Sequence, residues 1–299
     1  MSSITDVYSP RTTFRCTRLR GAKVGSSVCQ FCAVGCSQLG FLKDGKLIDV
    51  EGDPRSSVNE GRLCPKGSST YALNENPYRK VKPMYRAPGS DHWKEVSLDW
   101  MLDTVAKRIW ETRNKGFVEK DPKTGITVNN CANIGFIGGS ANDNEECYLF
   151  RKLFTGGLGI LPVENSARYC HSTTVCALSP TFGFGACTNP PRDLLNSDCI
   201  LIMGSNMAEA HPCAFYWPMQ AKKKGTVTIH VDPRYTRTSA ACDHHVHIRP
   251  ETDIAFLSGI IRYLLEKDLW FKEYVLAYTN ASTIINPNFN FDDATGLFN

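Results

Sequence analysis

Four cysteines near the N-terminus constrain this chain more than any other feature of its sequence. Their spacing is Cys29-x2-Cys32-x3-Cys36-x27-Cys64, and Pro65 follows the last of them. Three crowded thiolates can wrap one iron–sulfur cluster while a distant fourth closes the site, and a Cys-Pro pair also ends ferredoxin-like runs. Zinc bound by four cysteines is the alternative, although such sites usually present two Cys-x2-Cys pairs. The spacing therefore favours an iron–sulfur cluster that transfers electrons.

The remaining cysteines show no pairwise ligand spacing. The chain has 13 cysteines in 299 residues, and an odd number in a chain of this length does not fit a secreted disulfide framework. We expect eight of them to be small buried apolar residues. These eight are Cys16, Cys131, Cys147, Cys176, Cys187, Cys199, Cys213 and Cys242.

Charge and hydropathy exclude several classes of function. The net charge of +4 is small and dispersed, which argues against a nucleic-acid surface. No apolar run approaches the roughly 20 residues of a membrane-spanning helix, and the first twenty residues contain no apolar leader segment. We therefore expect a cytoplasmic protein without nucleic acid or direct membrane insertion. Export together with a partner that carries a leader stays open.

Two regions follow from the distribution of turns and periodic segments. Residues 1–90 are rich in turn residues and end in proline-containing stretches, which predicts a small cluster domain. In residues 91–299, apolar runs alternate with helical periodicity, which predicts an α/β domain built from βαβ units. Expected strands cover Ile134–Ile137, Ile200–Met203, Val227–Val231 and Val246–Ile248, and expected helices cover 98–109 with Ser97 as its cap, 143–155, 214–223 and 253–266. The tail from Ile284 is polar and rich in turn residues.

A second chemically able segment contains Arg168, Cys170 and His171. A nucleophilic cysteine with a histidine base is one interpretation, but adjacent side chains on an extended chain point to opposite sides. A soft metal ligand at Cys170 and a purely structural pair are the alternatives. The segment alone does not decide among the three.

Small and polar residues follow two of the expected strands. Gly204–Pro212 follows the first, and Asp232 and Arg234 follow the second. Ligands of α/β sheets bind at the carboxyl ends of strands, where a carboxylate can bind a ribose hydroxyl and an arginine a phosphate. Because a GxGxxG fingerprint is absent, we set a nicotinamide cofactor aside and keep another nucleotide open.

Together these segments resemble the catalytic subunit of molybdenum- or tungsten-dependent formate dehydrogenases of the formate dehydrogenase-N type. The wider family is that of the molybdopterin-guanine-dinucleotide oxidoreductases, and the resemblance runs from about residue 25 to the end. The segments that carry it are the cysteine run with Cys64–Gly67, Ala167–His171, Met203–Pro212, Asp232–Thr238, Arg86–Asp91 and Ala177–Gly183.

The resemblance implies a [4Fe–4S] cluster on Cys29, Cys32, Cys36 and Cys64, and a small cluster domain followed by an αβα Rossmann-like domain. It implies that Cys170 coordinates molybdenum or tungsten and that His171 takes part in formate chemistry. A bis-molybdopterin guanine dinucleotide would bind this metal. The implied cofactor contacts are Lys66, between cluster and pterin, Arg168, Gly204, Ser205, Asn206, Glu209, His211, Asp232, Arg234, Thr236, Thr238, Thr252 and Asp253. Glu251 stands where the family has a glycine.

Catalytic subunits of this family are several hundred residues longer than this chain. The resemblance therefore implies a split catalytic subunit, which oxidises formate to carbon dioxide or catalyses the reverse. A separate chain would complete the cofactor site and the cap, and an iron–sulfur subunit would carry electrons away. The alternatives are a truncated inactive product, another member of the family such as a nitrate reductase, and a stand-alone iron–sulfur electron carrier.

Overall fold

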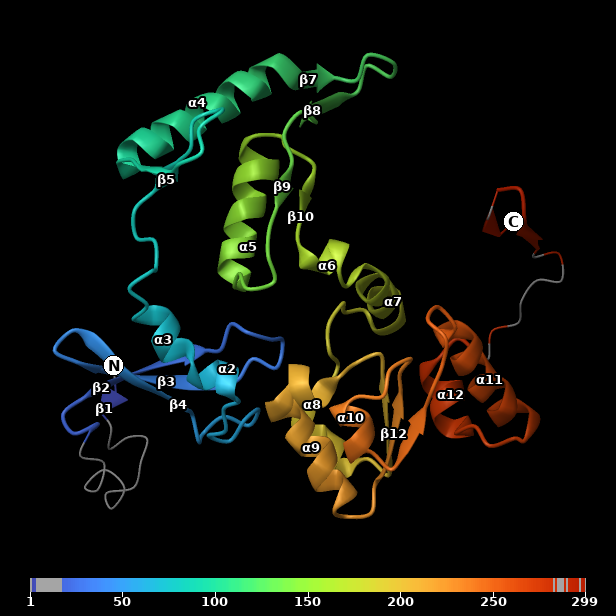
Figure 1. Ribbon diagram of the computed structural model, residues 1–299. Helices are drawn as coiled ribbons and strands as arrows, with labels where there is room; N and C mark the ends of the chain where they lie inside the picture. Colours follow the sequence, from blue (N-terminus) through green and yellow to red (C-terminus); the bar gives the residue numbers. More distant parts are fainter. Residues whose placement is uncertain are drawn as a thin grey trace.

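The computed structural model of the chain describes residues 2–3, 18–281, 283, 288, 290–295 and 297–298. Cys16 and part of the tail from Ile284 lie outside these residues. Figure 1 shows an antiparallel sheet near the N-terminus and a parallel sheet around β12. Along the chain, helices and short strands connect the two sheets.

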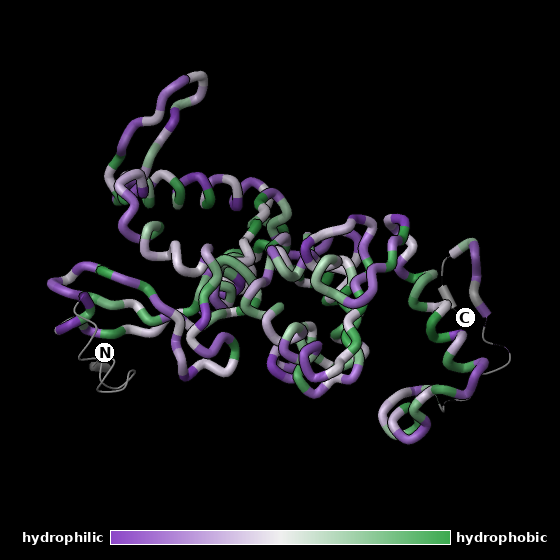
Figure 2. The backbone as a smooth tube through the Cα atoms, turned by 60° about the horizontal axis from the view of Figure 1, so that its bottom comes forward, coloured by the Kyte–Doolittle hydropathy of each residue, from purple (hydrophilic) through white to green (hydrophobic). Residues whose placement is uncertain are grey.

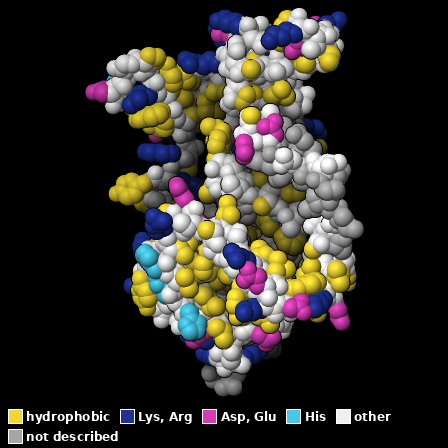
Figure 3. Space-filling model, turned by 90° about the vertical axis from the view of Figure 1, so that its right-hand side faces the viewer, with side chains coloured by type: hydrophobic (Ala, Val, Ile, Leu, Met, Phe, Trp, Pro, Cys, Tyr) yellow, Lys and Arg dark blue, Asp and Glu magenta, His cyan; other side chains and the backbone are white. Residues whose placement is uncertain are grey.

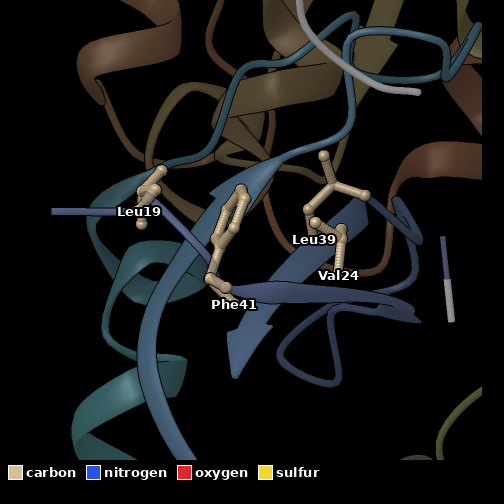
Figure 4. Packing of buried hydrophobic residues seen from close by; sticks show 5 residues of the cluster. Leu19, Val24, Leu39 and Phe41 are labelled. Carbon is tan, nitrogen blue, oxygen red and sulfur yellow. The ribbon is translucent and has the colours of Figure 1, made fainter. Parts of the chain in front are cut away.

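The N-terminal sheet consists of four antiparallel strands in the order β1-β2-β3-β4. Their bounds are Ser2–Ser3, Lys23–Val28, Ser37–Lys43 and Lys46–Gly52. The turn between β3 and β4 consists of Asp44 and Gly45, both with positive φ angles, as a two-residue hairpin turn requires. Alternation along the strands turns Val24, Leu39 and Phe41 to one face, where they are almost fully buried (Figure 4).

The second sheet is parallel, with the order β11-β12-β13. The strands are Cys199–Met203, Val227–Val231 and His244–Val246. Three helices connect them, namely α8 at Met207–Ala210, α9 at Pro212–Lys222 and α10 at Arg237–Ala241. The buried residues Ile200, Ile202, Phe215 and Ala221 form the core between this sheet and α9. This arrangement confirms the predicted α/β fold class.

A further βαβ unit contains the parallel pair β9, Phe136–Ile137, and β10, Val163–Glu164. Between them lie α5, Asn144–Arg151, and a π-helical segment, Lys152–Gly157. The predicted helix near 143–155 is therefore present, as α5 followed directly by this π-helical segment, which includes Gly156 and Gly157. Asp143 begins α5 with a capping box to Glu146.

The other elements are helical or short. Ser97 accepts a hydrogen bond from Trp100 N and caps α4, Leu98–Gly116, which confirms the predicted helix start. The remaining helices are α2 at Pro65–Ser68, α3 at Thr70–Asn74, α6 at Ser166–Tyr169, α7 at Ser172–Phe182, a 3-10 helix at Pro191–Asn196, α11 at Asp253–Glu266 and α12 at Lys272–Tyr278. The remaining strands form three hairpins: β5 at Met84–Tyr85 with β6 at Lys94–Glu95, β7 at Phe117–Lys120 with β8 at Thr127–Cys131, and β14 at Phe291–Asp292 with β15 at Leu297–Phe298.

The prediction of the last parallel strand at Val246–Ile248 was displaced by two residues. Pairing of Ile229 with His244 and of Val231 with Val246 sets the register, so β13 begins at His244 and ends at Val246. The predicted helix at 253–266 is confirmed as α11. In the part of the chain that the structure describes, no helix is long and apolar enough to cross a membrane.

Candidate cluster and cofactor site

The four cysteines of the N-terminal motif line one cavity. Cys29 begins the loop that follows β2, and its backbone N–H donates to the carbonyl of Cys36 at 2.8 Å. Gly35 adopts a φ angle of +65°, which lets the chain turn back between Cys32 and Cys36. Cys29 and Cys36 are buried, whereas Cys32 and Cys64 are half-buried at the same cavity.

A buried asparagine brings the distant Cys64 to the other three cysteines. Asn59 is 1% exposed and holds Ser37 at both backbone groups, with N–H···Oδ1 and Nδ2–H···O distances of 3.0 Å. Its Nδ2 also donates to the carbonyl of Arg62 at 2.8 Å. Asn59 therefore fastens the loop before Cys64 to the residue after Cys36. Sequence reasoning missed Asn59, because nothing in its neighbours signals a contact with Ser37.

The cavity has the properties of an iron–sulfur ligand set. Burial, together with the neighbouring thiols, raises the pKa of Cys36 to about 12. Without a metal the Cys36 sulfur is therefore a neutral thiol, and bound iron would replace its proton. A Cβ at Gly67 would lie 3.3 Å from Leu63 Cδ2 and 3.7 Å from Cys29 Sγ, so glycine keeps this wall of the cavity open. The four motif thiols that line the cavity are the donor set that the implied cluster requires.

The cavity has a fifth thiol. Cys213, at the start of α9, lines it and packs with Cys29 and Cys36. The expected buried position of Cys213 is confirmed, and Cys131 is also buried. Three of the other expected buried cysteines are exposed instead, because they lie on surfaces that no described residue covers. These three are Cys176, Cys187 and Cys199.

The turn that follows β11 has open space on one side and is held by hydrogen bonds on the other. Gly204 has a φ angle of +63°, and a Cβ added there would meet no atom within 4 Å. Behind the turn, the buried Thr238 hydroxyl donates to Asn206 Oδ1 at 3.0 Å and accepts from Ala208 N at 2.9 Å. The backbone of this turn is therefore exposed at the carboxyl end of a parallel strand, where nucleotides bind.

A buried histidine connects the two strand ends, and sequence reasoning missed it. His230 on β12 is fully buried, with Nε2 at 3.1 Å from the carbonyl of Ser205 and Nδ1 at 2.8 Å from Ser239 Oγ. A carbonyl only accepts hydrogen bonds, so Nε2 carries a proton and donates to Ser205. Through these two contacts the ring links the turn after β11 to α10.

The groups after β12 are arranged by local hydrogen bonds. The Asp232 carboxylate accepts from Arg234 N at 2.8 Å, and Thr236 caps α10 with a capping box to Ser239. Arg234, Thr236 and Glu209 share a shallow groove. Glu209 also pairs with Arg237, with Oε1 and Nε 3.1 Å apart. These groups form one surface at the strand ends.

Lys66 connects the cysteine cavity to this surface. It follows Cys64 by two residues, and its Nζ donates to the carbonyl of Glu209 at 2.9 Å. Two residues after Glu209, the buried Nδ1 of His211 has no hydrogen-bond partner among the described residues. A buried polar atom without a partner is costly, so His211 has the unmet hydrogen-bonding capacity that a bound cofactor would satisfy.

Cys170 and His171 lie at the junction of α6 and α7, and both are exposed. Each backbone N–H donates to the carbonyl of Ser166, at 2.8 and 3.0 Å, which fixes a tight bend between the helices. Arg168 pairs with Glu164 at 3.1 Å and lines the neighbouring cavity with it. Among the described residues, no hydrogen bond or ion pair joins this segment to the cysteine cavity.

Thr252 and Asp253 lie at the start of α11. Among the described residues, no hydrogen bond joins their side chains to the strand-end surface. The Thr252 hydroxyl donates to the carbonyl of Arg249 at 2.6 Å. Glu251, which stands at the expected glycine position, has a φ angle of +69°. The loop therefore keeps the left-handed conformation that glycine adopts without strain.

Comparison with known protein families gives two matches. The description "Molybdopterin oxidoreductase Fe4S4 domain" matches residues 22–76, and "Molybdopterin oxidoreductase" matches residues 79–269. The first range contains all four cysteines of the motif. The match confirms the prediction of an iron–sulfur cluster over zinc, and the second confirms the predicted molybdopterin cofactor.

Individual proteins are similar over most of this chain. It is 52% identical to the formate dehydrogenase subunit alpha of Megalodesulfovibrio gigas, over 93% of this chain and 27% of that protein. It is 43% identical to the formate dehydrogenase-O major subunit of Escherichia coli, over 91% of this chain and 27% of that protein. The chain thus spans about a quarter of the length of these relatives.

Among solved structures, acetylene hydratase from Pelobacter acetylenicus matches 84% of this chain and 33% of its own, with a TM-score of 0.65 and 22% identity. At this level of identity the likeness concerns the fold alone. It agrees with the mixed α/β architecture that the sequence predicts.

Proposed function

The chain belongs to the molybdopterin oxidoreductase family, and we propose that it forms the N-terminal part of a formate dehydrogenase catalytic subunit. The proposed reaction converts formate to carbon dioxide, one proton and two electrons, or runs in reverse. The observation that supports it most strongly is the single cavity lined by Cys29, Cys32, Cys36 and Cys64, joined through Lys66 to the strand-end surface. The relatives' names supply the substrate.

In this proposal the four cysteines hold a [4Fe–4S] cluster, and Lys66 lies between cluster and pterin. A lysine ammonium has three donors. One is used on the Glu209 carbonyl, which leaves two for an anionic cofactor. Its charge also favours the more negative, reduced form of the cluster. Lys66 would thus supply a fixed positive charge between the cluster and the pterin.

The turn after β11 and the groups after β12 bind one guanine dinucleotide in this proposal. Exposed backbone at Gly204 and Ser205 would approach the ligand, while the hydrogen bonds of Asn206 and Thr238 hold the turn in place. Arg234 suits a phosphate and Asp232 a ribose hydroxyl. The remaining proposed contacts are Glu209, His211, Thr236, Thr252, Asp253 and Arg168.

Cys170 and His171 are the proposed catalytic residues. When bound, the molybdenum or tungsten cofactor accepts the two electrons of formate, and the Cys170 thiolate is a soft ligand suited to that metal. His171 would accept the proton released from formate at an imidazole nitrogen, which has a lone pair free for it. The bend at Ser166 keeps the two side chains at one helix junction.

The exposure of this junction supports a further part of the proposal. Cys170 is exposed, and α7 has no buried residue. We propose that polypeptide corresponding to the remaining length of the relatives covers this face and completes the cofactor site, either as a separate chain or as a continuation of this one. An iron–sulfur electron-transfer subunit is the proposed electron acceptor.

Assays of the complex test this function. The 299-residue chain, produced together with polypeptide that supplies the remaining cofactor and cap regions, should contain molybdenum or tungsten and reduce an artificial electron acceptor with formate. Cys170→Ala should abolish that activity, whereas Cys187→Ala, which changes an exposed cysteine outside the proposed site, should retain it. Nitrate reduction in place of formate oxidation would contradict the substrate. Iron without molybdenum or tungsten would instead indicate a stand-alone electron carrier.

A further inference from the structure

The cluster cavity contains one thiol more than a [4Fe–4S] cluster needs. Cys213 lies at the start of α9, 149 residues after Cys64 in the sequence, and its side chain is 7% exposed. It packs with Cys29 and Cys36 in one buried group, against which Cys64 is also packed. With four cysteines assigned to the four irons, Cys213 remains beside the ligands with its proton.

The position of Cys213 is fixed by the helix that carries it. Pro212 begins α9 and also lines the cavity, so the N-terminal end of this helix points to the cluster site. One turn further on, Trp217 Nε1 donates to the carbonyl of Val58 at 3.0 Å. That bond ties α9 to the same loop that Asn59 fastens, so the thiol has little freedom to move away.

The hydrogen-bonding choices of the Cys213 thiol are few. Its Sγ lies 3.8 Å from the carbonyl of Arg62, a long and weak contact even for sulfur. Apart from this carbonyl, the thiol packs against the side chains of Cys29 and Cys36 in the buried group. Once Cys36 is a thiolate bound to iron it can only accept, which leaves the proton of Cys213 as the donor.

We infer that Cys213 is a positioning residue of the cluster site, whose thiol donates an S–H···S hydrogen bond to the Cys36 thiolate and raises the reduction potential of the cluster. The inference rests on the proposed function, since it requires the cluster. Reduction adds negative charge to the cluster and its ligand sulfurs. A donor aimed at one of those sulfurs therefore stabilises the reduced form more than the oxidised form.

Two substitutions separate the hydrogen bond from packing. Cys213→Val keeps the apolar volume and removes the donor, whereas Cys213→Ser keeps a donor on a side chain of similar shape. Cys131→Val is the matched control, because Cys131 is fully buried on β8 and does not line the cavity. Each full-length variant is reconstituted anaerobically with iron and sulfide. Its midpoint potential is then measured by a redox titration followed by electron paramagnetic resonance.

The inference predicts a lower midpoint potential for Cys213→Val, a potential near that of the wild type for Cys213→Ser, and no change for Cys131→Val. Electron–nuclear double resonance of the wild-type cluster in H2O and D2O should also show an exchangeable proton coupling that Cys213→Val lacks. Equal potentials for wild type and Cys213→Val would overturn the inference, as would equal shifts for valine and serine. Should Cys213→Val fail to fold, a wild-type cluster without an exchangeable coupling contradicts the inference by itself.

Failure of the inference and failure of the proposed function give different results. If the wild-type chain binds a [4Fe–4S] cluster whose potential does not respond to Cys213, only the hydrogen bond is refuted. If the wild-type chain binds no such cluster, the proposed function is refuted, and the inference falls with it.

Discussion

Two kinds of region differ in where their apolar side chains lie. The N-terminal sheet and the β11–β13 sheet each have a buried core, formed around Phe41 and around Phe215. By contrast, α4, α7, α11 and α12 have no buried residue, although their sequences are amphipathic or apolar. Figure 2 shows much of α11 as hydrophobic, and Figure 3 shows apolar side chains across the face on the side of α11 and α12.

This difference in burial divides the residues of the proposed site into two groups. The cysteine cavity, Lys66 and the turn after β11 belong to the packed regions and are fixed by internal hydrogen bonds. Cys170 and Thr252 belong to exposed helices. The packed regions therefore fix the cysteine cavity and the strand-end surface, while the proposed catalytic junction lies between helices that have no buried residue.

The largest expected effect contrasts Phe41 with Ile254, which is 81% exposed on α11. Phe41→Ala should lower the free energy of unfolding by about 3–5 kcal/mol, because it leaves a cavity in a closed core. Ile254→Ala should change it by less than about 0.5 kcal/mol. Chemical denaturation of the 299-residue chain measures both. A similar loss for the two variants would refute the contrast between packed and exposed regions.

The hydrogen bonds of His230 are the next test of the packed region. His230→Leu leaves the Ser205 carbonyl without its donor and removes the contact of Ser239 Oγ with the ring, so we expect a loss of about 2 kcal/mol in the free energy of unfolding. His247→Leu serves as the control, because His247 directly follows β13 and is exposed. If His230→Leu is as stable as the control, the ring does not fasten the turn.

Acid should act on the packed sheet through Asp243. Hydrogen bonds from Lys222 and Thr228 hold the pKa of Asp243 well below its usual value of 3.8. Since the folded pKa is lowered, the stabilisation is fully present above the ordinary aspartate range, and it is lost progressively as the pH falls from that range toward the lower folded pKa.

The melting temperature, measured from pH 6 to pH 3, should therefore fall more for the wild type than for Asp243→Asn. Asp193→Asn provides a comparison on the exposed 3-10 helix and should keep the wild-type pH profile. Parallel profiles for the wild type and Asp243→Asn would contradict the assigned contribution.

The smallest expected effect is at the loop before α11. Glu251 is held at a φ angle of +69°, so Glu251→Gly should raise the free energy of unfolding by up to about 1 kcal/mol. Glu251→Ala has the same backbone restriction and should give no gain. Thermal denaturation compares the two, and equal stabilities would show that the left-handed conformation costs nothing.

Sequence reasoning was most successful where the signal is local. The cysteine spacing, the Ser97 cap and the strands at Ile200–Met203 and Val227–Val231 each follow from neighbouring residues, and the structure contains the cap and the strands. The cysteines of the motif meet at one cavity. Local chemistry thus predicted the fold class and the main cluster residues.

The missed features depend on contacts between distant segments. Asn59 reaches Ser37, His230 reaches Ser205, and Cys213 reaches Cys36, and no spacing rule connects these pairs. The prediction that the remaining cysteines are buried was wrong at Cys199, which is exposed. Whether a residue is buried depends on which other segments cover it, and the residue type alone does not give that information.

The most direct test of the account is the iron and sulfide content of the anaerobically reconstituted 299-residue chain. The account predicts about four iron and four sulfide atoms per chain, with the spectroscopic signature of a [4Fe–4S] cluster that is lost in Cys64→Ala and kept in Cys242→Ala. Bound zinc without sulfide, or a cluster that survives in Cys64→Ala, would contradict it.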